Sequence, residues 1–506
     1  MHARTKPCIV PHVKSEVQRP QEEEGSANRE AAGSQSVAGL VLCPSRIVPG
    51  RAQPAPFRPS SLVVGPASEP LSSRFDSAYH ASMYHTSYEE RRRIESLDAE
   101  SLARHQLARL NVLLDEILPR NRFYAEKLGD LKLPLESLDA LAEVPFTFKD
   151  ELHGTQETGD LPTNLTFPPD HYVRFHQTSG TRGRPLLVLD TAEDWQWWLE
   201  GWQYVLDAAA IDSADRAMLA FSFGPFIGFW SAFDAVAARG AMVVPSGGMS
   251  TLARLELLRT SRATALLCTP TYALHMAETG HAHQIETASY NVRVVIVAGE
   301  PGGSMSAIRD RIEQAYGATV IDHAGATEVG PWGYADANGT GLHVNEGAFL
   351  AEFLSVETGK AGGEGELSEL VLTTLGRVGC PLIRYRTGDL VRPTWNTEGT
   401  NHFVLLGGGV LGRADDMLVI RGVNIFPSSI EQILRSFPEV VEFRLTADKA
   451  GEMDALTVEV EDRLDAPDRI AKELRLRLNL RVDVQGVPVG SLPRFEGKGR
   501  RFVDKR

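Results

Sequence analysis

The sequence is poor in cysteine and in long apolar runs. Its four cysteines lie far apart among 506 residues and form no C-x-x-C pair, which argues against a disulfide framework and a cysteine-based zinc site. Cys268 lies in an apolar run, where we expect a reduced thiol in the core and therefore a reducing, cytoplasmic compartment. The longest apolar runs, such as residues 294–298, fall far short of the roughly 20 residues that span a bilayer, which excludes a membrane-spanning protein.

Positive charge is also scarce. The 52 Lys and Arg residues are outnumbered by 66 Asp and Glu residues, which gives a formal net charge of −14 at pH 7. Sequence-independent binding of nucleic acid needs a basic surface, so we expect no nucleic-acid partner, and we expect no membrane partner either. An anionic substrate would need its charge met locally, by backbone amides, a metal ion or a few well-placed cations.

Residues 1–82 differ in composition from the rest of the chain. They contain ten of the 29 prolines, with Ser, Gly and Ala between them and no sustained periodicity. Such a segment cannot bury enough apolar surface to offset its ordering entropy. We expect either a disordered tail with a docking or regulatory role, or upstream sequence outside the working protein with Met83 as the true start.

From residue 87 onward the pattern predicts regular structure. A helix start at Ser87 is followed by leucines at helical spacing, and after residue 170 short β-branched runs alternate with helical stretches. This alternation predicts an α/β fold with a large domain over 83–412. The predicted strands and helices of this domain include strands 292–297 and 370–372 and helices 251–262 and 304–316.

A second organisation begins at residue 413. The pattern there predicts a small α+β domain over 413–506. Its expected elements, in order, are strand 417–420, helix 428–436, strands 441–446 and 455–460, and helix 467–479. The sequence therefore predicts three parts: a tail, a large domain and a small domain.

The strongest local motif is the glycine-rich segment 178–185. Its two glycines permit a close approach of the backbone to a ligand, and the hydroxyl and guanidinium groups around them suit phosphate oxygens. The Walker pattern is absent, and a polar hairpin turn between a strand near residue 174 and a strand over 186–189 is the alternative interpretation. The candidate binding residues are Thr178, Ser179, Gly180, Thr181, Gly183 and Arg184.

Four further motifs follow along the chain, at residues 324–328, 385–390, 412–417 and 496–498. Together with the glycine-rich segment, they resemble the signature of the adenylate-forming enzymes, the superfamily of acyl-CoA synthetases, adenylation domains and luciferases. The resemblance implies that Thr327 meets a phosphate and that Glu328 binds Mg²⁺. It also implies that Asp389 holds the ribose hydroxyls, that the hinge contains Asp415, and that Lys498 is the catalytic lysine. The further residues that it assigns to the nucleotide are Gly299, Glu300, Pro301 and Arg413.

Within this superfamily the sequence most resembles the phenylacetate–CoA ligases, from about residue 88 to the C-terminus. The resemblance implies a large multi-sheet adenylation domain followed by a small, mobile domain that carries Lys498. Without it, Lys498 would be interpreted as a solvated cation in a basic tail, and Asp389 as a turn residue. The segments that carry this resemblance are 121–124, 145–149, 413–431 and 497–506.

The resemblance implies an AMP-forming acid–thiol ligase. An aromatic carboxylic acid and MgATP would give acyl-AMP, and coenzyme A would then displace AMP. Such a step depends mainly on positioning and on neutralising charge at phosphate oxygens, and Lys498 would bridge the acid carboxylate and the α-phosphate. ATP, Mg²⁺ and coenzyme A are therefore the implied cofactors, and the resemblance is compatible with a homodimer.

The acid pocket is expected near residues 221–230, which carry five aromatic residues interrupted by Gly and Pro. This interruption favours a loop at a site, although aromatic stripes more often pack in a core. The predicted pocket residues are Phe223, Gly224, Phe226 and Trp332. We interpret a neighbouring helical stripe as core packing, and its members are Trp195, Trp198 and Trp202.

Two positions depart from the family pattern. Arg184 stands where relatives have Lys, which keeps the charge but changes its geometry. Ala324 stands where relatives place a Tyr that stacks on adenine, and His323 would replace part of that stacking. With the changed segment 328–334, these departures leave an alternative, namely transfer of the acyl group to an amine or a carrier-protein thiol in secondary metabolism. A third hypothesis, a catalytically silent relative, is disfavoured by the intact catalytic motifs.

Overall fold

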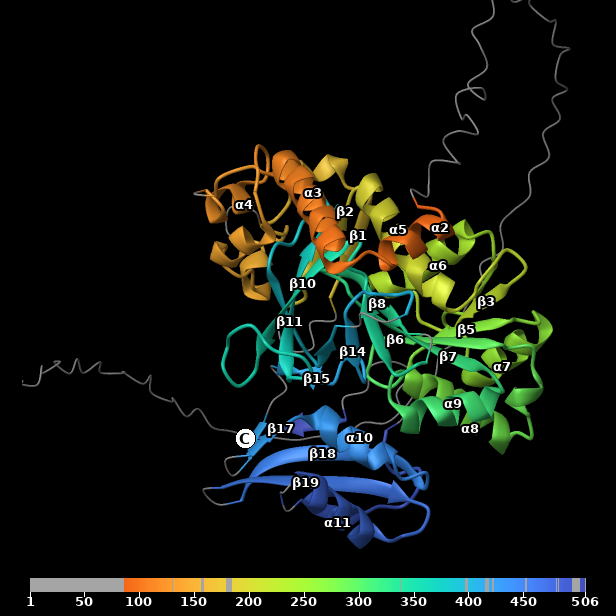
Figure 1. Ribbon diagram of the computed structural model, residues 1–506. Helices are drawn as coiled ribbons and strands as arrows, with labels where there is room; N and C mark the ends of the chain where they lie inside the picture. The colour runs from red at the N-terminus through yellow and green to blue at the C-terminus, as the bar shows by residue number, and fades with distance from the viewer. Residues whose placement is uncertain are drawn as a thin grey trace, which may run out of the picture. The chain divides into compact units, whose positions relative to one another are not determined.

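The computed structural model of the chain (Figure 1) describes most of the sequence beyond residue 85. The described residues are 86–129, 131–155, 159–178, 184–336, 338–395, 399–414, 418–420, 423–450, 453–478, 480, 482–493 and 501–505. All of them belong to one compact unit, Ser72–Arg506. The tail expected over 1–82 and the alternative start at Met83 lie outside the described residues.

The first described elements are helices whose starts carry polar caps. α2 (Tyr88–Glu95) begins after Ser87, whose hydroxyl accepts a hydrogen bond from the Glu90 amide at 3.1 Å, so the predicted helix start is confirmed. α3 (Ala99–Ile117) and α4 (Arg122–Lys127) follow, and each begins after a residue whose side chain caps the first turn. The leucines predicted at helical spacing form the buried face of α3 and include Leu102, Leu110, Leu113 and Leu114.

A nine-stranded mixed sheet forms the centre of the large domain (Figure 1). In chain order its strands are β3 (Arg216–Leu219), β4 (Met242–Pro245), β5 (Ala265–Cys268), β6 (Val294–Ala298), β7 (Thr319–Ala326), β8 (Gly330–Ala335), β9 (Gly341–Val344), β13 (Pro393–Thr394) and β14 (Leu405–Gly407). Their order across the sheet is β13–β14–β9–β8–β7–β6–β5–β3–β4. From β4 to β7 the neighbours pair in parallel, and from β7 to β13 they pair antiparallel. The strand predicted over 292–297 is β6, and it starts two residues later than expected.

Helices cover both faces of this sheet because its central strands are apolar on both sides. Alternate strand residues such as Leu267 and Ile296 pack in one core, and the residues between them, such as Leu266 and Val295, pack in a second core. The helices α5 (Ala192–Ala208) and α6 (Ile227–Ala238) supply much of the first core, to which α2 and α3 add Ile94 and Leu102. The helices of the second core are α7 (Thr251–Thr260), α8 (Pro270–Ala282) and α9 (Ser306–Tyr316), so both helices predicted in this region are confirmed.

The tryptophan stripe of α5 is part of the first core. Trp195, Trp198 and Trp202 are 4%, 2% and 3% exposed, which confirms the core interpretation. The short 3₁₀ turns of the large domain are η2 (Leu138–Glu143), η3 (Lys149–Leu152), η4 (Pro169–His171) and η5 (Thr287–Ser289).

Two smaller antiparallel sheets complete the large domain. The strands β10 (Phe349–Ser355), β11 (Ser368–Thr374), β12 (Tyr385–Val391) and β15 (Gly412–Arg413) pair in that order. The strands β1 (Arg174–Gln177) and β2 (Leu187–Asp190) form a hairpin on either side of the glycine-rich segment. The strand pair expected around that segment is therefore confirmed, and so is the strand predicted over 370–372, which lies within β11.

The C-terminal region has a core of its own, formed by residues such as Ile430, Leu445 and Ile470. Its elements are β16 (Leu418–Ile420), β17 (Val423–Ile425), α10 (Pro427–Arg435), β18 (Val440–Ala450), β19 (Met453–Asp462), α11 (Pro467–Leu478), β20 (Asp483–Gly486) and β21 (Phe502–Asp504). The α+β architecture is confirmed. The paired strands β18 and β19 run past the predicted apolar stretches because main-chain pairing continues through polar residues such as Asp448 and Lys449. The domain boundaries near residues 82 and 412 stay predictions.

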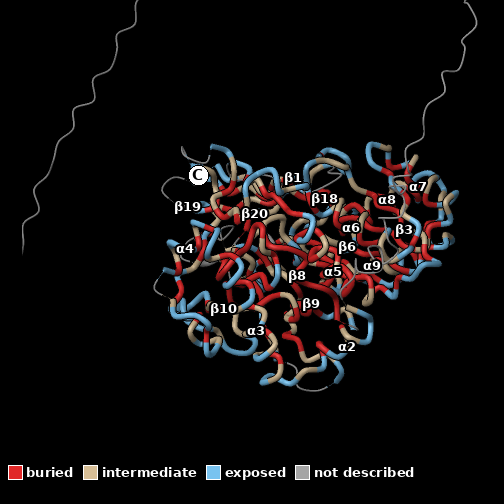
Figure 2. Tube along the Cα trace, turned by 90° about the horizontal axis from the view of Figure 1, so that it is seen from above, coloured by how far each residue is buried: buried red, intermediate tan, exposed pale blue. Residues whose placement is uncertain are grey.

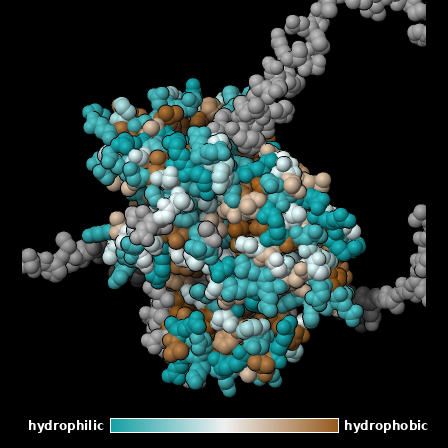
Figure 3. Space-filling view, turned by 45° about the vertical axis from the view of Figure 1, so that its right-hand side comes forward, coloured by the Kyte–Doolittle hydropathy of each residue, from teal (hydrophilic) through white to brown (hydrophobic). Residues whose placement is uncertain are grey.

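Buried residues gather along the central strands β6, β8 and β9, as Figure 2 shows. The face seen in Figure 3 is mostly hydrophilic, and the apolar side chains on it are interspersed with polar ones. Cys268 is 0% exposed, as predicted for a core thiol, and burial raises its pKa. In the part of the chain that the structure describes, no helix is both long and apolar enough to cross a bilayer.

Candidate functional site

The hairpin β1–β2 closes the base of the glycine-rich turn. Thr178 is 6% exposed, its amide donates to the Leu186 carbonyl at 2.9 Å, and its hydroxyl accepts from the Leu186 amide at 3.0 Å. Arg184 is exposed and forms an ion pair with Asp160. The other predicted residues of the turn lie outside the described residues; they are Ser179, Gly180, Thr181 and Gly183.

Glu328 lies in the turn between β7 and β8, and two side chains converge on it. Its Oε1 accepts hydrogen bonds from the Lys149 ammonium at 3.1 Å and from the Tyr385 hydroxyl at 3.0 Å. The Glu328 side chain is 12% exposed, and Thr327 beside it is half-buried. The predicted metal-binding carboxylate is therefore largely buried, and it is held by a cation and a phenol.

The β12 edge brings Lys149 to this position. Thr147 pairs with the start of β12, because its amide donates to the Arg384 carbonyl at 2.8 Å and its carbonyl accepts from the Arg386 amide at 3.0 Å. The Thr147 hydroxyl donates to the Ile383 carbonyl at 2.7 Å. This short parallel bridge fixes the segment that leads into Lys149 beside Tyr385, so both donors to Glu328 start from one edge.

Opposing effects act on the pKa of the Glu328 carboxyl. Burial raises it, but the charge of Lys149 and hydrogen bonds that include those from Lys149 and Tyr385 lower it, and the net pKa lies below the ordinary value of 4.5. Burial and the charge of Glu328 raise the pKa of Tyr385 well above its usual range. The phenol therefore stays protonated and donates a hydrogen bond to Glu328. Glu328 is therefore ionised near neutral pH.

The main chain of Glu328 is also held. The Arg377 guanidinium donates from Nη1 to the Glu328 carbonyl at 2.6 Å and from Nη2 to Asp190 at 2.6 Å. Lys149, Tyr385 and Arg377 are not among the site residues predicted from the sequence. Lys149 and Tyr385 do lie in segments that match the family pattern, whereas no local pattern marks Arg377.

Asp389 and Arg413 lie opposite each other across β12 and β15. Arg413 Nη1 is 3.0 Å from Asp389 Oδ1, and the Asp389 side chain is 15% exposed. The Asp389 amide donates to the Thr387 hydroxyl at 3.0 Å, and Gly388 between them has a φ of 75°, which favours glycine. The structure thus brings these two predicted nucleotide residues together. The predicted hinge residue Asp415 and the predicted catalytic residue Lys498 lie outside the described residues.

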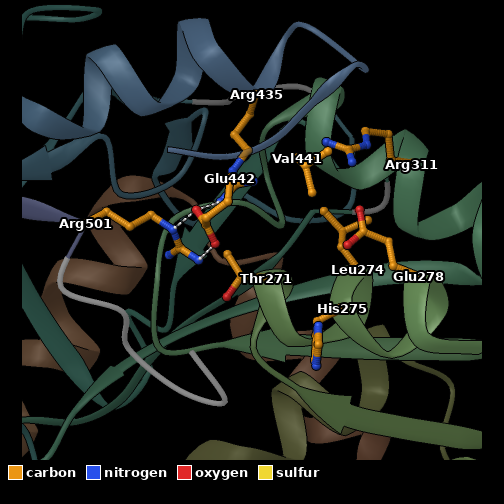
Figure 4. A pocket seen from close by; sticks show the side chains of 9 residues that line it. All are labelled: Thr271, Leu274, His275, Glu278, Arg311, Arg435, Val441, Glu442 and Arg501. Atoms are coloured by element: carbon orange, nitrogen blue, oxygen red, sulfur yellow. Dashed lines mark hydrogen bonds and ion pairs between the residues drawn. The ribbon is translucent and has the colours of Figure 1, made fainter. Parts of the chain in front are cut away.

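The Gly299–Pro301 segment follows β6 at the end of the central sheet. Gly299 has a φ of 93°, and Glu300 Oε1 accepts hydrogen bonds from the Thr271 amide at 2.8 Å and the Thr271 hydroxyl at 2.5 Å. This pair ties the segment to the first turn of α8. Thr271 is also one of the residues that line the polar cavity in Figure 4, where Arg501 donates to Glu442.

The middle of β7 carries two buried titratable groups, Asp322 and His323. Asp322 Oδ2 accepts hydrogen bonds from the Ser304 amide at 2.9 Å and its hydroxyl at 2.6 Å, and burial raises the pKa of Asp322 to about 6. His323 Nδ1 lies 2.7 Å from the Gly333 carbonyl, and burial lowers the pKa of His323 to about 4. The His323 ring centre is 4.3 Å from that of Trp202, inside the first core. This burial corrects the expectation that His323 replaces the missing aromatic stack at Ala324.

The aromatic segment 221–230 is a loop followed by α6, as its Gly and Pro residues predicted. The Phe223 ring packs edge-on against Trp230 at 5.0 Å, and the Gly224 carbonyl accepts a hydrogen bond from the Trp230 indole at 2.9 Å. Phe226 is 38% exposed. Trp332 is 1% exposed within the first core, which favours a packing role over the predicted pocket role.

Among the described residues, no group of three or more His, Cys, Asp or Glu side chains is arranged to hold a metal ion. Any cation at Glu328 would therefore take part of its coordination from a ligand or from water.

The sequence matches two family models and several curated proteins. The AMP-binding enzyme family model matches residues 104–349, and the AMP-binding enzyme C-terminal domain model matches residues 422–506. The chain is 30% identical to the phenylacetate–coenzyme A ligase of Pseudomonas putida, over 82% of this chain and 96% of that protein. The enzyme of the same name from Thermus thermophilus is also 30% identical, over 82% of this chain and 98% of that protein.

Among solved structures, the chain is similar to a 2-hydroxyisobutyryl-CoA ligase in the post-adenylation state, in complex with R3-HIB-AMP. The TM-score is 0.77 at 25% sequence identity, over 84% of this chain and 94% of that chain.

Asp322→Asn should change how stability depends on pH. Because burial raises the pKa of Asp322 from 3.8 to about 6, the folded protein binds a proton that the unfolded chain has released, and stability falls as the pH rises through this window. Asparagine keeps an acceptor for Ser304 and cannot ionise. We expect the variant to gain up to about 3 kcal/mol relative to the wild type between about pH 4 and about pH 7. Thermal unfolding without ligand measures this difference.

Asp310→Asn is the control, because the Asp310 side chain on α9 is 67% exposed. The relative gain should be absent from this variant. Stability profiles of Asp322→Asn and the wild type that stay parallel across the window would contradict the assignment.

Proposed function

The chain belongs to the family of AMP-binding enzymes that includes the phenylacetate–coenzyme A ligases, and from this premise we propose that it activates an aromatic carboxylic acid with ATP and transfers the acyl group to coenzyme A. The single observation that carries the proposal is the convergence of Lys149 and Tyr385 on Glu328. An ionised carboxylate held at a fixed point beside a cation suits a site that must bind a metal-bound polyphosphate.

Mg²⁺ fits the residues present. Mg²⁺ prefers oxygen ligands, keeps several waters, and is usually bound by one or two carboxylates together with substrate phosphates. Both side-chain contacts of Glu328 fall on Oε1, and its lowered pKa keeps the carboxylate charged. Glu328 would therefore hold the ion together with the nucleotide, and the bound ion would neutralise charge on the phosphate oxygens.

The chemistry requires two displacements. A carboxylate oxygen of the acid attacks the α-phosphorus of ATP and pyrophosphate leaves, and then the thiol of coenzyme A attacks the acyl carbonyl and AMP leaves. Asp389 and Arg413 would hold the ribose and orient the α-phosphate. Lys498 would bridge the acid carboxylate and the α-phosphate during the first displacement. Thr178 and Arg184 would contact phosphate oxygens at the base of the glycine-rich turn.

The acid is proposed to be aromatic. The rings of Phe221 and Phe229 pack at 4.4 Å, and Phe223 packs against Trp230. The loop before α6 and the first turn of α6 therefore offer aromatic faces of the kind that stack on an aryl ring. The phenylacetate–coenzyme A ligases to which this chain is similar carry an aryl acid in their name. Both described cysteines are buried thiols, which supports a reducing, cytoplasmic location. The homodimer and a role in secondary metabolism stay predictions.

The direct test is pyrophosphate release from ATP and Mg²⁺ with a panel of aryl and arylacetic acids, with and without coenzyme A. We expect release that depends on one class of acid, and an acyl-CoA product that forms when coenzyme A is added, because both displacements use the same site. Mass spectrometry of the product identifies the acceptor.

Two results would contradict the proposal. An adenylate that accumulates, ignores coenzyme A and is consumed by amines or by a carrier-protein thiol would favour the alternative acceptors that Ala324 and the altered segment 328–334 suggest. No pyrophosphate with any acid, despite measurable nucleotide binding, would favour a catalytically silent relative.

Lys149→Met should shift the pH dependence of the first displacement. Because the Lys149 charge lowers the pKa of Glu328, its removal raises that pKa, and a larger share of Glu328 is protonated below neutral pH. We expect the acidic limb of kcat/KM for ATP to move to higher pH, with a rate loss of about tenfold at the acidic end that shrinks as the pH rises. Acid-dependent pyrophosphate release measured across the pH range gives the profile.

Lys127→Met is the matched control. Lys127 also forms a Lys–Glu pair, with its Nζ 2.8 Å from Glu151 rather than from Glu328. Its profile should keep the wild-type acidic limb. An unchanged acidic limb in Lys149→Met would show that Lys149 does not set the charge of Glu328.

A further inference from the structure

We propose that Arg377 is a positioning residue, which holds Glu328 at a fixed distance from the glycine-rich hairpin and thereby sets the affinity for the magnesium–nucleotide complex. This inference rests on the proposed function, because it assigns Arg377 to the same ATP site. The observation behind it is a single buried guanidinium that contacts both parts of that site.

Arg377 is 0% exposed and joins two segments far apart in the sequence. Its Nε and Nη2 donate to Asp190 Oδ1 at 2.9 and 2.6 Å, and its Nη1 donates to the main-chain carbonyl of Glu328 at 2.6 Å. Asp190 is the last residue of β2, the strand that leaves the glycine-rich turn. The planar guanidinium therefore links the strand behind the phosphate loop to the residue that would hold the metal.

The Asp190 end of this link is rigid. Asp190 is 0% exposed, and its Oδ1 also accepts a hydrogen bond from the Trp198 indole of α5 at 3.2 Å. Burial raises the pKa of Asp190, but the charge of Arg377 and further contacts lower it below its ordinary value, so the pair stays ionised. A movement of β2 would therefore pull directly on Arg377.

The loop that carries Arg377 is fixed on both sides. Arg109 donates to the Leu375 carbonyl at 3.1 and 2.7 Å, and the Gly379 amide donates to Asp194 at 3.0 Å. Gly376 has a φ of 133°, and a Cβ there would lie 2.9 Å from both Arg109 and Trp197. The backbone of Arg377 therefore cannot shift to compensate if its side chain is shortened.

Stability alone is a weak explanation for this arrangement. A buried ion pair loses much of its attraction to the cost of desolvation, and an apolar pair of similar volume often serves a fold as well. A lysine would offer a single point charge, whereas the three contacts of Arg377 need donors in a planar fork. The hydrogen bond from Nη1 is the informative one, because its acceptor is the carbonyl of Glu328, the proposed metal-binding residue.

Arg91 provides a matched control elsewhere in the chain. It is 4% exposed, its Nε and Nη2 donate to Asp207 at 2.7 and 2.9 Å, and its Nη1 donates to the Thr86 carbonyl at 2.6 Å. This is the same pattern of one aspartate and one main-chain carbonyl, without Glu328. Arg377→Lys and Arg91→Lys therefore remove equivalent contacts. The difference is that the main-chain carbonyl belongs to Glu328 in the first case and to Thr86 in the second.

The experiment measures binding rather than turnover. The full-length wild type, Arg377→Lys and Arg91→Lys are titrated by calorimetry with α,β-methylene-ATP, once with Mg²⁺ and once with a chelator, and each is melted without ligand. For Arg377→Lys we expect affinity for the magnesium complex to fall by about 10- to 100-fold, while affinity for the metal-free nucleotide changes by less than about threefold. The melting temperature of Arg91→Lys should fall by a comparable amount. Its affinities for the magnesium complex and for the metal-free nucleotide should both stay at the wild-type level.

A wild-type affinity in Arg377→Lys, or an equal loss in Arg91→Lys, would overturn the inference. If Arg377→Lys does not fold, the double variant Arg377→Gln with Asp190→Asn replaces it, because it removes both buried charges together. The double variant should show the same loss for the magnesium complex, and its retention of wild-type affinity would also overturn the inference. A wild type that binds no nucleotide at all would instead refute the proposed function itself.

Discussion

Glu328 is held by three residues that are far from it in the sequence. Lys149 and Tyr385 bind its side-chain oxygen, and Arg377 binds its main-chain oxygen. Such hydrogen bonds, two of which involve a cation, each contribute about 1–3 kcal/mol. Their joint effect is to fix both the position and the charge of one buried acid. A site that must bind a metal-bound polyphosphate needs both properties before the ligand arrives.

The fold supplies these residues through sheet edges rather than through one continuous motif. The start of β12 carries Tyr385 and pairs with the segment that ends in Lys149. The other end of β12 places Asp389 opposite Arg413 on β15. Glu328 follows β7 of the central sheet, and Asp190 is the last residue of β2 in the hairpin β1–β2. The candidate site is thus assembled where three sheets meet, which makes it sensitive to substitutions that change no catalytic side chain.

Much of this architecture could be predicted from local pattern. Helix caps, alternating runs and Gly or Pro punctuation identified the α/β class, the glycine-rich hairpin and the core helix with its tryptophans. The contacts of Glu328 could not be predicted in this way, because Lys149 and Arg377 are 179 and 49 positions away. Burial was equally invisible at His323 and Trp332, since an aromatic residue in a motif has the same letter in a pocket as in a core. The family resemblance predicted Glu328 as the metal-binding residue. The contacts in the structure show which residues hold it.

We expect Glu328 to organise the first displacement while contributing little to the fold. Acid-dependent exchange of labelled pyrophosphate into ATP reports that displacement alone, without coenzyme A. Glu328→Gln keeps the shape and an acceptor for Tyr385 but loses the charge. The Tyr385 and Arg377 hydrogen bonds can persist in Glu328→Gln, and only the charge that faces Lys149 is lost. We therefore predict a melting temperature within about 4 °C of the wild type and a fall in exchange of about 100-fold or more. Exchange at the wild-type rate in a folded Glu328→Gln protein would contradict the account.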